Sequence, residues 1–234
     1  MPKEMDRRQF IKTMAGGAVG AAGLSMLGGI PLAHAEEKAA PAFEGKAKFA
    51  GVHNTRAISP DLIYLGASDV RLELFENVYP IPRGVSYNAY LLRDEKTVLF
   101  DTVDRSVSGQ FFENLHHALE GRPLDYLIVN HMEPDHCSAI SEVLTRWPAV
   151  QLICSKTAAP MVKQFFGFEV EKHGYTVSEG DTLNTGQHEL HFVMVPMVHW
   201  PEVMMTYDAT DWCSFPPMPS ARSARWAATC SRMR

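Results

Sequence analysis

Between residues 59 and 212, short runs of apolar and aromatic residues alternate with segments in which apolar residues recur every three or four positions. Short apolar runs between turn-forming residues predict buried strands, whereas the longer spacing predicts amphipathic helices. The predicted strands are Leu62–Leu65, Val70–Phe75, Tyr87–Leu92, Thr97–Phe100, Leu124–Val129, Val150–Cys154 and Leu190–Val195.

Three segments have the helical pattern. Residues 106–119 carry their apolar side chains on one face, and two shorter helices are predicted over residues 139–147 and 158–166. Strands mixed with helices in this order indicate an α/β sandwich whose helices cover the sheets.

Charge is distributed unevenly along the chain, which has 234 residues and a formal net charge of −5. Residues 1–35 carry +2, residues 36–212 carry −11 and residues 213–234 carry +4. The two ends therefore need separate explanations from the body. An acidic body does not favour nucleic-acid binding, so no nucleic-acid partner is expected.

The N-terminal segment has the features of an export signal. Arg7 and Arg8 precede a stretch, residues 13–35, without any Asp, Glu, Lys or Arg, and it ends in Ala-His-Ala. This resembles a twin-arginine signal with cleavage after Ala35, which predicts export to the periplasm. The stretch contains many glycines, which makes it a poor membrane helix. Residues 36–58 are expected to form a flexible lead-in.

The loop after the predicted strand Leu124–Val129 concentrates potential metal ligands. His131, Glu133, Asp135 and His136 lie within six residues. Imidazole and carboxylate together suit iron, manganese or zinc, and loops at strand ends hold reachable side chains on a rigid scaffold. Two ions can be held if the first two residues serve one ion and the last two serve the other.

This loop resembles the metal-binding motif of the metallo-β-lactamase fold, whose hydrolases carry His-x-His-x-Asp-His at that place. Glu133 in place of the second His resembles one branch, the flavodiiron proteins, which reduce dioxygen to water or nitric oxide to nitrous oxide. The resemblance covers roughly residues 60–212. Three further stretches share it: Glu73–Asn77, Pro82–Asn88 and Met197–Glu202.

The resemblance implies an αββα sandwich that holds two iron ions. His131 and Glu133 would bind one iron with His199, and the pair Asp135–His136 would bind the other. A carboxylate in place of an imidazole adds negative charge, which favours the ferric state formed during oxidation. Asp101, at the end of a predicted strand, is expected to support a ligand.

The family pattern also includes a bridging Asp, a final His and a flavodoxin-like domain that binds flavin mononucleotide (FMN), and none of these is found in this chain. We therefore expect residues 59–212 to form a C-terminally incomplete diiron domain with impaired turnover, and FMN only in the missing domain. The family implies a rubredoxin-like or flavin electron donor and a homodimer.

Residues 213–234 contain no Leu, Ile, Val, Lys, Asp or Glu. Such a composition is not expected to pack a core. Codons compatible with this segment can encode, in another reading frame, the Ser-x-Asp-Ala-Phe-Gly stretch expected in the family. We therefore predict a frame-shifted tail that begins near Trp212. The alternative is a native Arg-rich disordered tail.

Two other functions remain open: a zinc-dependent hydrolase of the same fold, against which Glu133 argues, and a non-catalytic metal-binding remnant. Cys137 and Cys154 are expected to be buried thiols. Two histidines of the predicted helix cannot both face one site, and four others have no ligand-like neighbours in sequence. All six are expected to be surface or core residues: His116 and His117 in the helix, and His53, His173, His188 and His191.

Overall fold

The computed structural model describes residues 53–75 and 78–215, and the backbone of residues 229–230. The chain divides into two units, residues 1–48 and 49–234, and every described residue belongs to the second. The predicted signal and most of the predicted tail lie outside the described residues. Within the described part, no helix is both long enough and apolar enough to cross a membrane.

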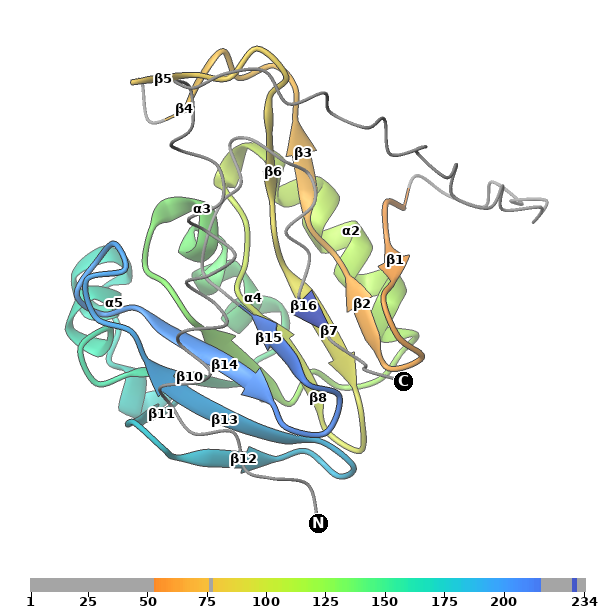
Figure 1. The fold of residues 1–234 in the computed structure, drawn as a ribbon, viewed down its shortest axis with the longest axis vertical. Helices are drawn as coiled ribbons and strands as arrows, with labels where there is room; N and C mark the ends of the chain where they lie inside the picture. The colour runs from red at the N-terminus through yellow and green to blue at the C-terminus, as the bar shows by residue number, and fades with distance from the viewer. Residues whose placement is uncertain (1–52, 76–77, 216–228, 231–234) are drawn as a thin grey trace, which may run out of the picture. The chain divides into compact units, whose positions relative to one another are not determined.

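A seven-stranded mixed sheet forms the centre of the domain, with strand order β1-β2-β7-β8-β9-β10-β11 (Figure 1). Its first four strands pair antiparallel, and β8 to β11 pair parallel. The strands are β1 (Arg56–Ala57), β2 (Leu62–Tyr64), β7 (Tyr90–Arg93), β8 (Thr97–Phe100), β9 (Tyr126–Val129), β10 (Gln151–Ser155) and β11 (Gly174–Val177).

A second, antiparallel sheet has the order β12-β13-β14-β15-β16. It comprises β12 (Thr182–Asn184), β13 (Glu189–Met194), β14 (Met204–Asp208), β15 (Cys213–Phe215) and β16 (Thr229–Cys230). The remaining strands form two short antiparallel pairs: β3 (Ala67–Asp69) with β6 (Val85–Tyr87), and β4 (Leu74–Phe75) with β5 (Tyr79–Pro80).

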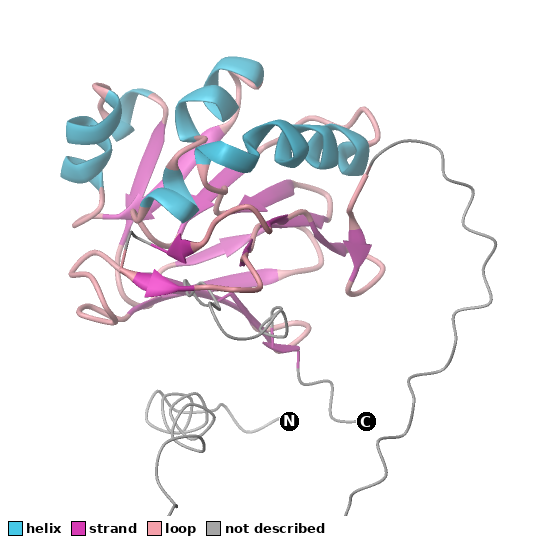
Figure 2. Cartoon of the chain, turned by 90° about the horizontal axis from the view of Figure 1, so that it is seen from above, coloured by secondary structure: helices cyan, strands magenta, loops and turns pink. Residues whose placement is uncertain are grey.

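The helices form one layer over the seven-stranded sheet (Figure 2). They are α2 (Ser108–Leu119), α3 (Pro134–Cys137), α4 (Ile140–Arg146) and α5 (Ala159–Phe166), with 3-10 turns η1 (Arg105–Val107) and η2 (Val170–Lys172). Among the described residues, no helix covers the outer face of the five-stranded sheet. The architecture is therefore that of the predicted sandwich, with its last layer incomplete.

Strand β8 separates two hydrophobic cores. Leu99 faces the core beneath the helices, whereas Val98 and Phe100 face the core between the two sheets. Successive side chains of a strand point to opposite faces, so a strand that is covered on both faces is apolar throughout. This explains why Thr97–Phe100 was predicted with the bounds that the structure shows.

Two predicted strands differ from those in the structure. The segment Val70–Phe75 was wrong as one strand: the Asp69 carboxylate accepts the backbone N–H of Arg71, which makes a turn, and Val70 is 77% exposed. Only Leu74–Phe75 of that segment is extended, in β4. The predicted strand Tyr87–Leu92 is split between β6 and β7.

The predicted lead-in and tail both contribute residues to the fold. Arg56–Ala57 of the lead-in pairs with β2. Cys213–Phe215, at the start of the predicted tail, pairs with β14 and is buried. The Phe215 ring stacks on Phe100 with a centroid separation of 3.9 Å. The expectation that no residue after Trp212 packs in a core is thus wrong for these three residues.

The two cysteines predicted as buried thiols are free and buried, which confirms that prediction. Burial raises the pKa of Cys137 and of Cys154 to about 12. Both are therefore uncharged thiols that fill core space near neutral pH.

Phe215→Ala is expected to destabilise the domain by about 3 kcal/mol, because it removes a buried ring between the sheets. Urea denaturation followed by circular dichroism measures this difference. Trp212→Ala is the control, since Trp212 is 37% exposed and its loss should change stability little. Equal midpoints for Phe215→Ala and the unmodified chain would contradict the packing of β15.

Candidate metal centre

Asn130 fixes the start of the ligand-bearing loop to both sheets. Its N–H donates to the Asp101 carboxylate at 2.6 Å, at the end of β8. Its carbonyl accepts the N–H of Met204, and its side-chain oxygen accepts the Thr206 hydroxyl at 2.8 Å. Met204 and Thr206 both lie on β14. The loop therefore leaves β9 in a position set by the packing of the sheets.

The other end of the loop enters the short helix α3. Pro134 is its first residue, a position that suits the fixed φ of proline. The His136 carbonyl accepts both the N–H and the hydroxyl of Thr102, at 2.7 and 2.8 Å. The ligand segment is thus held at both ends, which orders its side chains before any ion binds.

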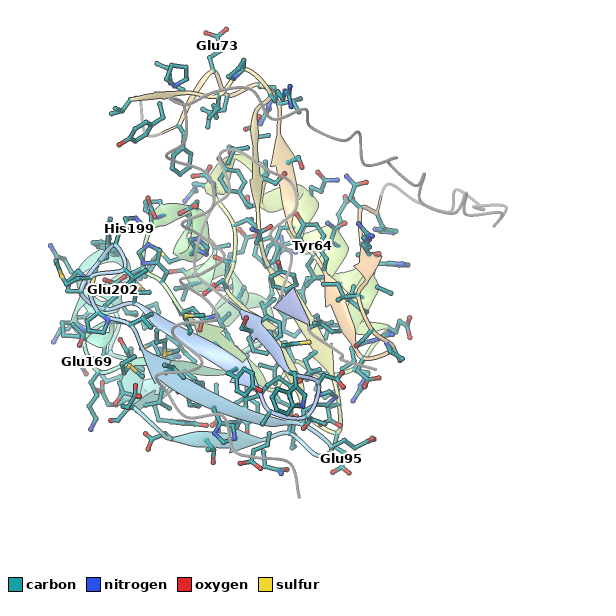
Figure 3. The ribbon with its side chains drawn as sticks, in the orientation of Figure 1. Tyr64, Glu73, Glu95, Glu169, His199 and Glu202 are labelled. Atoms are coloured by element: carbon teal, nitrogen blue, oxygen red, sulfur yellow. The ribbon has the colours of Figure 1, made fainter. Side chains whose placement is uncertain are left out.

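Three of the predicted ligands converge on one point. The Glu133 Oε2 atom lies 3.0 Å from His131 Nε2 and 3.1 Å from His199 Nε2. His131 and Glu133 are buried, whereas the His199 side chain is half exposed. His199 reaches them from the connection between β13 and β14, near Glu202 (Figure 3). These three residues offer ligand atoms within 4.8 Å of one another, as a metal ion requires.

Glu202 orients His131 and had no role in the sequence analysis. Its Oε1 atom lies 2.7 Å from His131 Nδ1 and accepts the N–H of Met132 at 3.0 Å. A carboxylate on one ring nitrogen fixes the tautomer, so that the other nitrogen can bind metal. Burial raises the pKa of Glu202, but the bonds from His131 and Met132 outweigh it and lower the pKa overall.

Asp135 and His136 lie beside this group but do not join it within 4.8 Å. The His131 and His136 ring centroids are 5.4 Å apart. Asp135 Oδ2 is 3.6 Å from His136 Nε2, and Asp101 Oδ2 is 3.4 Å from His136 Nδ1. Asp101 thus touches both the loop and a predicted ligand.

The carboxylate oxygens of Asp135 and the ring nitrogens of His136 lack hydrogen-bond partners although they are buried. Buried polar atoms are almost always bonded, because leaving them without a partner costs free energy. A cation bound between these atoms would satisfy them. The residues therefore fit a metal site, and their oxygen and nitrogen atoms suit a first-row transition metal.

The buried carboxylates around His131 favour a positive charge at this site. Burial lowers the pKa of His131, but hydrogen bonds with Glu133 and Glu202 outweigh it and raise the pKa to about 9. Burial raises the pKa of Asp135, and the Glu133 charge adds to that effect. Protons and metal cations compete for such atoms, so the carboxylate-rich centre attracts either one.

A pocket of about 320 Å³ opens beside Glu133 and Asp135. Its walls mix the apolar side chains Leu72, Leu74 and Phe75 with polar ones that include Asp69, Tyr87, Asp104 and Ser106. Since a water molecule takes about 30 Å³ of liquid volume, a diatomic gas has ample room beside these carboxylates.

Two further side-chain groups contain histidines outside the predicted ligand set. His53 and His117 stack on each other with a ring-centroid separation of 4.1 Å. His188 is a buried residue, as one of the two expected settings, and the fold brings Asp61 and Asp211 to it, with ligand atoms within 4.8 Å of its ring nitrogen. These neighbours are distant in sequence, so no local pattern indicated them.

A sequence profile described as "ODP family beta lactamase" matches residues 85–215. The chain belongs to the ODP beta-lactamase family. The matched region contains β6 to β15 and every predicted ligand, so the metal centre lies within the family's domain.

Named relatives and solved structures of this ODP chain agree with that assignment. The anaerobic nitric oxide reductase flavorubredoxin of Pectobacterium carotovorum is 38% identical over 156 residues, 66% of this chain and 31% of the relative. A flavoprotein of Thermotoga maritima has a TM-score of 0.62 at 32% identity, over 66% of this chain and 39% of that structure. Rubredoxin oxygen:oxidoreductase of Desulfovibrio gigas has a TM-score of 0.64 at 28% identity, over 67% and 39%.

The ODP chain thus resembles flavodiiron proteins in the metallo-β-lactamase-like domain, as the sequence motifs predicted. It spans about a third of the length of the curated relatives that it matches.

Glu202→Gln is expected to weaken metal binding by the ODP domain about ten- to a hundredfold, because it removes the charge that holds His131. Competition with a chelator for Zn²⁺ measures the affinity. Glu169→Gln makes the same charge change at a surface site, where Glu169 pairs with Lys163 and Lys172, and should bind as the unmodified chain does. Equal affinities in all three proteins would refute the role of Glu202.

Proposed function

We propose that this ODP domain is the diiron part of an oxidoreductase that reduces dioxygen to water, nitric oxide to nitrous oxide, or both. The observation that carries the proposal is the position of Glu133 between His131 and His199, with Asp135 and His136 beside them. A carboxylate at this place adds negative charge, which stabilises an oxidised metal. Zinc hydrolysis needs no redox change and gains nothing from that charge.

In this proposal, His131, Glu133 and His199 hold one iron, and Asp135 and His136 hold the other. Two ferrous ions held there would supply two electrons, which with two protons convert two molecules of nitric oxide to nitrous oxide and water. Reduction of dioxygen to water needs four electrons, so the electron donor would supply the other two. Glu202 keeps the Nε2 atom of His131 directed at Glu133. The pocket beside Glu133 and Asp135 has apolar as well as acidic lining residues, so it can admit a small neutral gas next to the ligands.

The names of the relatives support the electron supply that we propose. A flavorubredoxin and a rubredoxin:oxygen oxidoreductase are both similar to this chain. We therefore propose a rubredoxin-like or flavin electron donor, with FMN carried outside this domain. Assembly as a homodimer is proposed from the family resemblance in the sequence alone.

The test is to load the full chain with Fe²⁺ without oxygen and then to follow nitric oxide or dioxygen consumption with an artificial reductant. We expect slow, iron-dependent consumption and no consumption by the Zn²⁺-loaded chain. Glu133→His, which gives the ligand motif of the hydrolases, should bind metal but lose the consumption.

Other outcomes separate the alternatives. Hydrolysis of β-lactam or thioester substrates by the Zn²⁺-loaded chain, without iron-dependent gas consumption, would assign a zinc hydrolase. Binding of either metal without gas consumption or hydrolysis would assign a non-catalytic metal-binding remnant. Rapid turnover with two tightly held irons would show that the five ligands suffice, against the expectation of impaired activity.

We also propose that the chain is exported by the twin-arginine route to the periplasm. Arg7-Arg8 and the uncharged residues 13–35 support this, and both lie outside the described residues. A fusion of residues 1–40 to a reporter that is active only after export should reach the periplasm of a bacterium. Replacement of both arginines by lysine should retain the reporter in the cytoplasm, and equal export of the two fusions would refute the signal.

A further inference from the structure

Two aspartate side chains and one histidine side chain, from distant parts of the chain, lie close together near the C-terminal end of β14. Asp61 immediately precedes β2, His188 immediately precedes β13, and Asp211 lies in the turn between β14 and β15. Each offers one ligand atom, and these atoms all lie within 4.8 Å of one another. His188 is 3% exposed, and the two aspartates are half-buried.

The His188 ring is held in one orientation by carboxylates on both nitrogens. Its Nδ1 atom lies 2.7 Å from Asp208 Oδ2, and its Nε2 atom lies 3.2 Å from Asp61 Oδ2. The His188 N–H also donates to the Asp94 carboxylate at 2.9 Å, which fixes the backbone. The Nε2 atom is therefore held on the side of the ring where the Asp61 and Asp211 carboxylates lie.

The two carboxylates on the His188 ring repeat those on the His131 ring at the main centre. There, Glu202 holds Nδ1 of His131 at 2.7 Å, and Glu133 faces Nε2 at 3.0 Å. Glu202 lies just before β14, and Asp208 is the last residue of β14. The two orienting carboxylates thus flank one strand, whose five residues span about 13 Å between first and last Cα atoms.

The group also carries excess negative charge. Asp61, Asp94, Asp208 and Asp211 gather around a single imidazole. Within residues 53–75 and 78–215, no Lys or Arg forms an ion pair with any of these four side chains. Asp94 is satisfied by the Thr185 hydroxyl and two backbone N–H groups. Asp208 also accepts the backbone N–H of Thr210 at 2.9 Å. Among the described residues, His188 is the one side chain able to carry positive charge that pairs with Asp61 and Asp208, and the net negative charge attracts a divalent cation.

We propose that Asp61, His188 and Asp211 form a second, structural binding site for a divalent transition-metal ion, with Zn²⁺ as its representative. Two carboxylates and one imidazole neutralise the ion and match its preference for nitrogen and oxygen ligands. Asp208 holds the histidine in the binding orientation. The ion joins the segment before β2, in the first sheet, to two turns of the second sheet. This site is independent of the redox function proposed for the main centre.

The experiment titrates the full, chelator-treated chain with Zn²⁺ and measures bound zinc per chain and the unfolding temperature. Asp61→Asn and Asp211→Asn are the test variants, because both positions are half-buried and asparagine keeps the side-chain size. Glu189→Gln removes a neighbouring charge outside the group and is the matched control. Circular dichroism verifies that each variant is folded.

We expect each aspartate variant to lose one equivalent of zinc at the concentration that saturates the unmodified chain, and at least part of the zinc-dependent rise in unfolding temperature. Glu189→Gln should match the unmodified chain. Unchanged stoichiometry in both aspartate variants would overturn the site, as would an equal loss in Glu189→Gln, which indicates non-specific binding. Glu133→Gln separates the two centres: it removes zinc from the main centre and should retain the equivalent that depends on Asp61.

Discussion

The carboxylate of Glu202 joins the two sheets at the metal centre. It comes from the segment that enters β14 of the second sheet, and it binds His131 and Met132 of the loop that leaves β9 of the first. The backbone carbonyl of Glu202 accepts the hydroxyl of Ser155, at the end of β10. A buried charge needs such bonds to offset its desolvation. The spacing of the sheets and the geometry of the ligands therefore depend on the same contacts.

The apolar core between the sheets sets that spacing. Phe100 and Ile128 of the first sheet face Phe192 and Met204 of the second, and all four are almost fully buried. Close-packed interiors resist compression and cavities alike. The polar bonds at the rim, including those of Asn130 to β14, can then be short and regular because the core holds the strands at a fixed separation.

Strands with continuous apolar runs were predictable, because both of their faces are covered. Strands β11, β12 and β14 were not predicted: Gly174–Val177 and Thr182–Asn184 are short and half exposed, and Met204–Asp208 mixes apolar with polar residues whose partners lie elsewhere in the chain. The ligand cluster at residues 131–136 was predictable because it is contiguous. Glu202 and the neighbours of His188 were not, because they meet their partners only through the register of the two sheets.

Strand β14 also limits how this sequence can vary in length. Its five residues pair in register with β13, and its last three pair with β15. An inserted or deleted residue inside the strand would turn the following side chains to the opposite face, so Glu202 and Asp208 could not both keep their histidines. Length changes are far better tolerated in the turn between α2 and β9, where Glu120 and Gly121 are exposed and no ligand residue is carried. Family members that differ in length are therefore expected to differ in such turns and to keep the strand itself constant.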